Sequence, residues 1–189
     1  MSSTTPPDSR PFVESAVAGI AAWLFGYVFT YLLVATDIEA SPLNRLVEFF
    51  EGESATYELV GWVFYNAHLV DVSYSGLGPL SPQGNFIGGD GFTPLLYIVP
   101  PALLIVAGLA IGRYTGATEP NDGAIAGALV TPGYLVLAVV GTFVFTVEVG
   151  GASGAPDLVP AVLIAGVVYP VVFGAIGGAI AAVTASESR

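Results

Sequence analysis

Four long apolar runs dominate this sequence of 189 residues and limit what it can fold into. They cover residues 12–35, 92–112, 123–147 and 158–185, and Glu14 is the only charged residue within them. About 20 helical residues cross the roughly 30 Å apolar core of a bilayer, so each run is long enough to span it. The sequence therefore predicts an all-α membrane protein, in which four transmembrane helices form a bundle within the lipid bilayer.

Charged residues are few and mostly acidic. The chain has 15 Asp and Glu residues and only four basic residues, all of them arginine. Nucleic acids need basic patches, so they are excluded as partners. An acidic chain without lysine suits a high-salt cytoplasm, where counter-ions screen the repulsion within a net charge of −11, and we expect a halophilic source. The absence of cysteine excludes disulfides and thiolate metal sites, and we expect no cofactor.

The longest polar region, residues 36–91, separates the first two apolar runs. It carries eight acids and one arginine, and its residues 43–50 have the apolar spacing of an amphipathic helix. We therefore predict an extracytoplasmic segment that contains one or two amphipathic helices. Residues 1–11 are rich in Ser, Thr and Pro, which predicts a short disordered tail in the cytoplasm.

Residues 58–72, with the sequence ELVGWVFYNAHLVDV, decide the topology. On a helical wheel the apolar side chains share one side, whereas Glu58, Tyr65, His68 and Asp71 gather on another. A spanning helix would place these polar groups in or near hydrocarbon, which is costly. We predict a helix that lies outside the membrane or along its surface. Packing on the bundle and a fifth span remain the alternatives.

The only histidine, His68, lies three residues before Asp71 on the predicted helix. Imidazole titrates near neutral pH, and a neighbouring carboxylate can orient its ring. Structural zinc sites use cysteine or several histidines, so a metal site is disfavoured here. The polar cluster is therefore a weak candidate site, interpreted as a pH-sensitive pair or a simple surface histidine.

The four arginines predict the orientation, because cytoplasmic flanks of membrane spans collect positive charge. With four spans and a cytoplasmic N-terminus, Arg10, Arg113 and Arg189 all lie inside and only Arg45 lies outside. With five spans, only Arg10 would lie inside. We predict a multi-pass protein of the cell membrane with both termini in the cytoplasm.

Prolines interrupt three of the four runs, at Pro100, Pro101, Pro132 and Pro170. Proline removes a backbone hydrogen bond, so a transporter could use such breaks to expose carbonyl groups to a substrate. Ordinary kinks are more common in membrane helices, and we interpret these prolines as kinks.

Glycines recur at a spacing of four within the same runs. Small residues let membrane helices approach closely, which predicts tight helix packing. Packing within one chain is the default, and a homo-oligomer is the alternative. The glycines concerned are Gly108, Gly112, Gly127, Gly174 and Gly178.

The run SPLNRLVEFFEGESATYELVGWVFYNAHLVD, followed by DGFTPLLYIVPP, resembles a group of uncharacterised haloarchaeal multi-pass membrane proteins. Some members of that group are loosely labelled transporters. The resemblance covers most of the chain and implies the cell membrane of a halophile. It carries over no functional residue.

Two functions remain from the sequence. The runs hold almost no ionisable group, and we find no nucleotide loop, nucleophile motif or pair of catalytic carboxylates, so we predict that the protein is not an enzyme. Our leading hypothesis is a four-helix protein whose extracytoplasmic segment packs on the bundle or contacts a membrane protein partner. The alternative is a small transporter or channel subunit that uses the proline breaks and glycine-rich faces of its spans.

Overall fold

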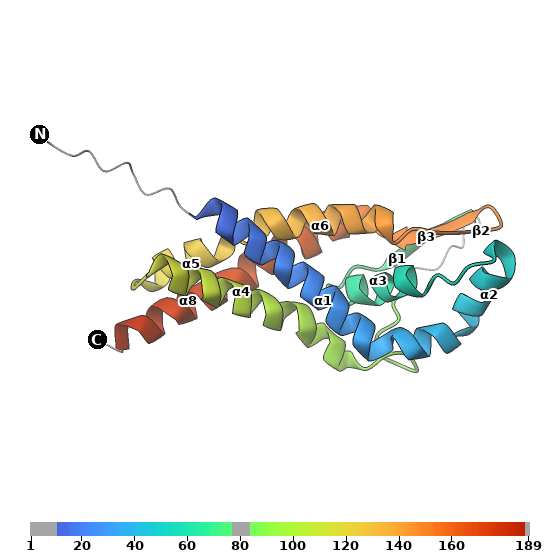
Figure 1. Ribbon diagram of the computed structural model, residues 1–189, viewed down its shortest axis with the longest axis horizontal. Coiled ribbons are helices and arrows are strands. Elements are labelled where there is room, and N and C mark those ends of the chain that lie inside the picture. The colour runs from blue at the N-terminus through green and yellow to red at the C-terminus, as the bar shows by residue number, and fades with distance from the viewer. Residues whose placement is uncertain (1–10, 77–83, 188–189) are drawn as a thin grey trace, which may run out of the picture.

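The chain enters and leaves the molecule at one end, and a small β-sheet lies at the other, as Figure 1 shows. We call these the terminal end and the sheet end. The structure is a computed structural model that describes residues 11–76 and 84–187. The predicted tail lies almost entirely outside these residues.

Four helical stretches of the described chain are long and apolar enough to cross a membrane, which confirms this part of the prediction. They cover Phe12–Ala40, Pro94–Thr115, Pro120–Val144 and Leu158–Ser186. Each stretch buries only one side, and large apolar side chains such as Leu32, Val106 and Leu163 are exposed. Exposed apolar surface of this extent suits contact with lipid.

Only the first stretch is one regular helix, α1 (Phe12–Ala40). The second joins a 3₁₀ turn, η1 (Pro94–Ile98), to α4 (Val99–Thr115). The third consists of α5 (Pro120–Ala128) and α6 (Thr131–Val144). The fourth contains a short α7 (Leu158–Pro160), a π-helical segment η2 (Ala161–Val168) and α8 (Tyr169–Glu187).

The prolines expected to kink these helices occupy helix starts. Pro100 and Pro101 lie in the first turn of α4, directly after the 3₁₀ turn η1. Their interpretation as kinks stays a prediction. Pro132 begins α6 just after the break between α5 and α6, and Pro170 is the second residue of α8, just after η2. These two prolines mark interruptions of the third and fourth stretches.

Glycines bring α8 into backbone contact with α4 and α5. A methyl group added at Gly108 or at Gly127 would overlap the carbonyl oxygen of Gly174. One added at Gly112 would press on the backbone of Gly178. All five glycines noted in the sequence therefore lie in helix contacts within one chain, as close approach of membrane helices requires.

Three short strands of the described chain pair at the sheet end, so the prediction of an all-α fold misses a part of the structure. They are β1 (Val72–Ser75), β2 (Val147–Val149) and β3 (Ala152–Pro156), which form an antiparallel sheet in the order β1-β3-β2. Gly150 and Gly151 join β2 to β3 with φ angles of 57° and 86°. A tight hairpin turn often has two adjacent residues at positive φ, and glycine adopts such φ angles without strain.

Two helices of the described residues lie between the first two stretches. The first, α2 (Pro42–Glu51), begins at Ser41, whose Oγ accepts a hydrogen bond from the Asn44 amide at 3.2 Å, and ends at Gly52 with a φ of 79°. The Asn44 side chain in turn accepts a hydrogen bond from the amide of Ala55 at 2.9 Å, one residue before α3 (Thr56–Asn66). Asn44 therefore fixes α3 relative to α2.

Candidate functional site

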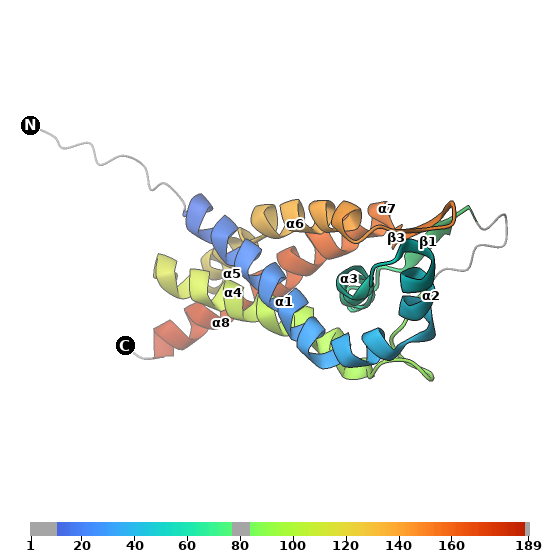
Figure 2. The ribbon, with the colours of Figure 1, turned by 45° about the vertical axis from the view of Figure 1, so that its right-hand side comes forward.

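Helix α3 packs against α1 and the sheet, which agrees with the alternative that this segment packs on the bundle. Nine of its eleven residues are buried. Figures 1 and 2 both show α3 between α1 and α6 in the half of the molecule near the sheet. The ring of Tyr57 stacks on Tyr31, whereas Phe64 packs on Trp23, nearer the terminal end of α1. Helix α3 therefore points from the sheet end toward the middle of the bundle.

Large aromatic rings and glycines alternate along this contact. At four glycines, an added methyl group would overlap an aromatic side chain. The pairs are Gly26 with Phe64, Gly61 with Phe145, Gly141 with Tyr65 and Trp23, and Gly154 with Trp62. Each ring thus fills the space that a missing side chain leaves, and α3 can approach α1, α6 and β3 closely.

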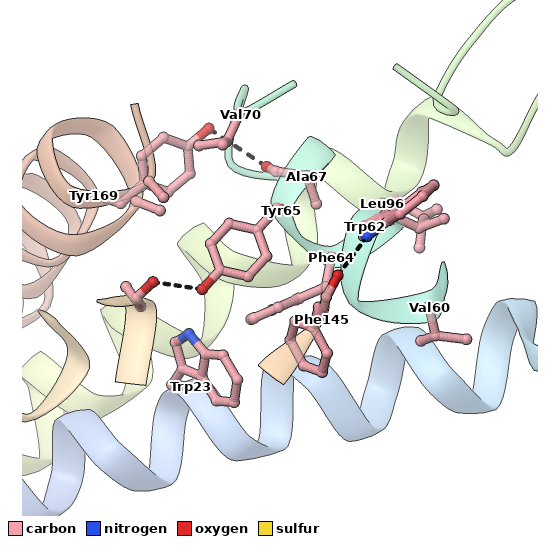
Figure 3. Packing of buried hydrophobic residues seen from close by; sticks show 14 of the residues in the cluster. Trp23, Val60, Trp62, Phe64, Tyr65, Ala67, Val70, Leu96, Phe145 and Tyr169 are labelled. Atoms are coloured by element: carbon pink, nitrogen blue, oxygen red, sulfur yellow. Dashed lines mark hydrogen bonds between the residues drawn. The ribbon is translucent and has the colours of Figure 1, made fainter. Parts of the chain in front are cut away.

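Two of these aromatic residues also donate hydrogen bonds to α6 and to the residue that directly follows it (Figure 3). The indole Nε1 of Trp62 donates to the carbonyl oxygen of Phe145 at 2.7 Å. The hydroxyl of Tyr65 donates to the carbonyl oxygen of Ala138 at 2.5 Å, and burial raises the pKa of Tyr65. A buried donor without a partner would be costly, so these bonds make an aromatic interior tolerable.

The chain reverses direction at the inner end of α3. Leu69 has a φ of 61°, a conformation that a residue other than glycine seldom adopts. Asn66 holds the turn in place: its Nδ2 donates to the carbonyl oxygens of Val70 at 2.9 Å and Gly84 at 3.1 Å, and its Oδ1 accepts from the amide of Phe86 at 2.8 Å. One buried side chain therefore bonds to three backbone groups, one in the turn and two at residues 84 and 86, and ties the turn to that later segment.

His68 lies in this turn and is 1% exposed. Its Nδ1 is 2.8 Å from the carbonyl oxygen of Phe64, which can only accept, so Nδ1 carries the proton. Nε2 is then an acceptor, and the hydroxyl of Tyr134 in α6 donates to it at 2.7 Å. The ring of Tyr169 in α8 packs against the imidazole with centroids 5.1 Å apart. The histidine thus links the tip of α3 to the third and fourth stretches.

Burial lowers the pKa of His68 to about 4, although the bond to the Phe64 carbonyl favours the charged form. At neutral pH the imidazole is therefore neutral. A neutral imidazole with both nitrogens in hydrogen bonds has no free lone pair to bind a metal ion or to accept a proton from a substrate.

The polar cluster proposed from the sequence does not form as one group. Asp71 accepts a long hydrogen bond from Asn85 at 3.4 Å and makes no hydrogen bond or ion pair with His68 among the described residues. Glu58 lies in the first turn of α3, at the opposite end of the helix from His68. The expected pairing of His68 with Asp71 is therefore wrong, because the turn after α3 directs the two side chains to different partners.

An open hollow lies at the terminal end, between the first turn of α1 and the loop from α4 to α5. It has a volume of about 990 Å³, and Glu14, Tyr114 and Asp122 are among its lining residues. The hydroxyl of Tyr114 donates to the Glu14 carboxylate at 3.4 Å. Within the described residues, no group of three or more His, Cys, Asp or Glu side chains could hold a metal ion.

The sequence matches one protein family over residues 1–185, and that family is described as a family of unknown function, DUF7978. No curated protein and no solved structure matches the chain significantly.

Proposed function

Because the chain belongs to the DUF7978 family, whose function is not known, we propose its function from the geometry alone. We propose a small non-enzymatic membrane protein of the cell membrane, with both termini in the cytoplasm and residues 36–91 outside. In this proposal the segment is a built-in cap: α3 holds the spans together, and the outer surface of α2 contacts a membrane protein partner.

The observation that carries this proposal is the burial of α3. Val60, Val63 and Phe64 are 0% exposed, and Trp62 and Tyr65 donate hydrogen bonds to α6 and to the residue that directly follows it. A segment that contributes this much of the core is a part of the bundle and not a separate domain. A protein whose spans are held together in this way is suited to present a fixed surface rather than to open and close.

The outer surface of α2 supports the second half of the proposal. Leu46, Phe49 and Phe50 are 50%, 82% and 59% exposed on one short helix at the sheet end. Aromatic side chains are enriched at protein interfaces. The other side of α2 is buried at Val47 and Asn44, so the exposed side is held at a fixed angle to the bundle.

The orientation is tested with single cysteines, because the chain has none of its own. We expect a membrane-impermeant thiol reagent to label Ser54→Cys on intact cells and to leave Thr118→Cys and Ser186→Cys unlabelled until the cells are opened. Labelling of position 118 or 186 on intact cells would contradict the proposed orientation.

The partner contact is tested in the same way at α2. We expect Phe49→Cys to be protected from the reagent in native membranes and labelled after purification in detergent. Ser54→Cys, which is also exposed, is the matched control and should react in both states. If both positions react equally fast in native membranes, nothing covers α2 and the contact is refuted.

A transporter or channel subunit is the second candidate, favoured by one observation. His68, just after α3, contacts two tyrosines that lie next to irregular backbone. Tyr134 follows the break between α5 and α6, and Tyr169 follows the π-helical segment η2. Irregular backbone inside a membrane protein often lines a transport site. Flux of protons or sodium ions into vesicles reconstituted with the purified protein, reduced by Tyr134→Phe, would favour this candidate over the first.

A further inference from the structure

A small hollow with apolar walls lies at the sheet end, and we call it the apolar hollow. Its volume is about 100 Å³. The end of α1, α2, α3 and the loop before η1 each contribute to its walls. The large side chains that line it are Ile38, Leu43, Leu59, Trp62, Phe86 and Phe92. Four parts of the chain thus meet around a space that no described residue fills.

Water is a poor occupant of the apolar hollow. A buried water needs about two to four polar partners, whereas the surface that lines the hollow is apolar. The two polar side chains among its lining residues bond elsewhere: Ser41 Oγ accepts from the Asn44 amide at 3.2 Å, and Trp62 Nε1 donates to the carbonyl oxygen of Phe145 at 2.7 Å. An apolar molecule would instead gain van der Waals contacts on every wall.

The walls of the apolar hollow are held in place. The Asn44 side chain fixes α2 to the start of α3. The Phe86 amide donates to Oδ1 of Asn66 at 2.8 Å, and the Phe92 amide donates to the carbonyl oxygen of Phe86 at 2.8 Å. The rings of Trp62 and Phe86 stack with centroids 6.0 Å apart. The hollow therefore cannot close through small side-chain shifts, and it is preformed, as most ligand sites are.

The surface beside the apolar hollow indicates where a ligand comes from. The exposed large apolar residues of α1 end at Leu33, less than two helical turns before Ile38. Phe92 is half-buried and lies shortly before Leu95, which is 68% exposed at the start of the second stretch. The hollow thus adjoins surface that we expect to contact lipid. Apolar solutes leave water for such surroundings, so the bilayer supplies the ligand.

We propose that the apolar hollow is a binding site for a small, uncharged, apolar molecule dissolved in the membrane. An engineered apolar cavity of about 150 Å³ binds benzene or xenon, so this smaller space suits a ligand of about four carbon atoms. A bound ligand would contact α1, α2 and α3 at once and hold α2 against the bundle. The site does not depend on the partner contact proposed for the outer surface of α2.

The experiment uses Trp62 as its reporter. Trp23→Phe leaves Trp62 as the only tryptophan, and this chain is purified in full length and placed in phosphatidylcholine nanodiscs. The probe is butyl bromide, whose bromine quenches tryptophan fluorescence on contact. Bromoethanol carries the same quencher with a hydroxyl group for which the hollow has no partner, and it is the polar control. Thermal unfolding of the wild-type chain with both compounds is the second measurement.

Three substitutions on α2 accompany this chain. Leu43→Phe adds volume inside the apolar hollow. The matched control is Leu46→Phe, the same change at a residue that is 50% exposed on the same helix and does not line the hollow. Leu43→Ala enlarges the hollow, so it tests the site even if the phenyl ring of Leu43→Phe turns outward.

We expect butyl bromide to quench Trp62 saturably and to raise the Tm of the wild-type chain, and bromoethanol to do neither. Leu43→Phe should bind at least about tenfold more weakly, since about fourfold in affinity is lost for each methylene group that no longer fits, and Leu46→Phe should bind normally. Leu43→Ala should gain about tenfold more from hexyl bromide over butyl bromide than the parent chain gains. Quenching that does not saturate, or equal binding by all three variants, would overturn the proposal.

Discussion

The burial of Phe64 makes the position of α3 testable by one substitution. Phe64 is 0% exposed, packs edge-on against Trp23 with centroids 5.3 Å apart and against His68 at 4.7 Å, and covers Gly26. We expect Phe64→Ala to lower the free energy of unfolding substantially. Phe49, at 82% exposure on α2, is the matched control, because it is the same residue type outside the core.

The expected loss follows from the cavity and the lost ring contacts. Removing the ring leaves roughly 100 Å³, which at about 24 cal/mol per Å³ costs about 2.4 kcal/mol. The two shortest of its four edge-to-face pairs, to His68 and Trp23, add about 0.5–1.5 kcal/mol each, so we expect a total of about 3–5 kcal/mol. For Phe49→Ala we expect a change within about 0.5 kcal/mol.

The assay is reversible unfolding in mixed micelles, followed by far-ultraviolet circular dichroism so that the signal does not depend on Trp23. If Phe64→Ala and Phe49→Ala differ by less than about 0.5 kcal/mol, α3 does not lie inside the bundle and the reasoning is refuted.

Three further predictions use the same unfolding assay. Tyr134→Phe removes the donor to Nε2 of His68 and leaves a buried acceptor unpaired, so it should cost about 1–3 kcal/mol; an unchanged stability would contradict the hydrogen bond. The pKa of His68 is lowered to about 4 in the folded state from about 6.5 when unfolded, so the unfolded state binds the proton first as the pH falls. The free energy of unfolding should therefore fall by about 2 kcal/mol from pH 7 to pH 5. His68→Gln should abolish this loss, and persistence of the loss would assign it to another group. Gly127→Ala should cost about 1–3 kcal/mol because its methyl group overlaps the Gly174 backbone, whereas the exposed Ile125→Ala on the same helix should cost about 0.5 kcal/mol or less.

The spans and their contacts follow from properties that the sequence displays directly. Length and the absence of charge predict the four long stretches, because the thickness of the bilayer sets both. Spacing is equally direct: Gly174 and Gly178 are one turn apart on α8, and the structure places them against glycines of α4 and α5. The spacing does not show which helices are the partners, since it shows only which face of a helix carries small residues.

Local signals existed for two features that our sequence reasoning missed. Thr131 followed by Pro132 is a typical helix start, so this pair could have predicted that a new helix begins there. The Gly150–Gly151 pair is a strong hairpin signal. The strands beside it escaped notice because they have only three and five residues and are built partly of Ala, Ser and Gly, which have low strand propensity.

The position of α3 could not be derived in this way, because its polar residues have two opposite explanations. Asn66 and His68 on an amphipathic helix indicate a wet surface when nothing else is known. In the structure they do the reverse. Buried polar backbone groups need hydrogen-bond partners, and these two side chains bond to Val70, Gly84, Phe86 and Phe64 around the turn. The acceptors and donors concerned lie up to 20 residues away along the chain, so their presence depends on the fold itself. The same polarity that argues against insertion of a straight span is thus what allows a short helix to enter the bundle and turn back.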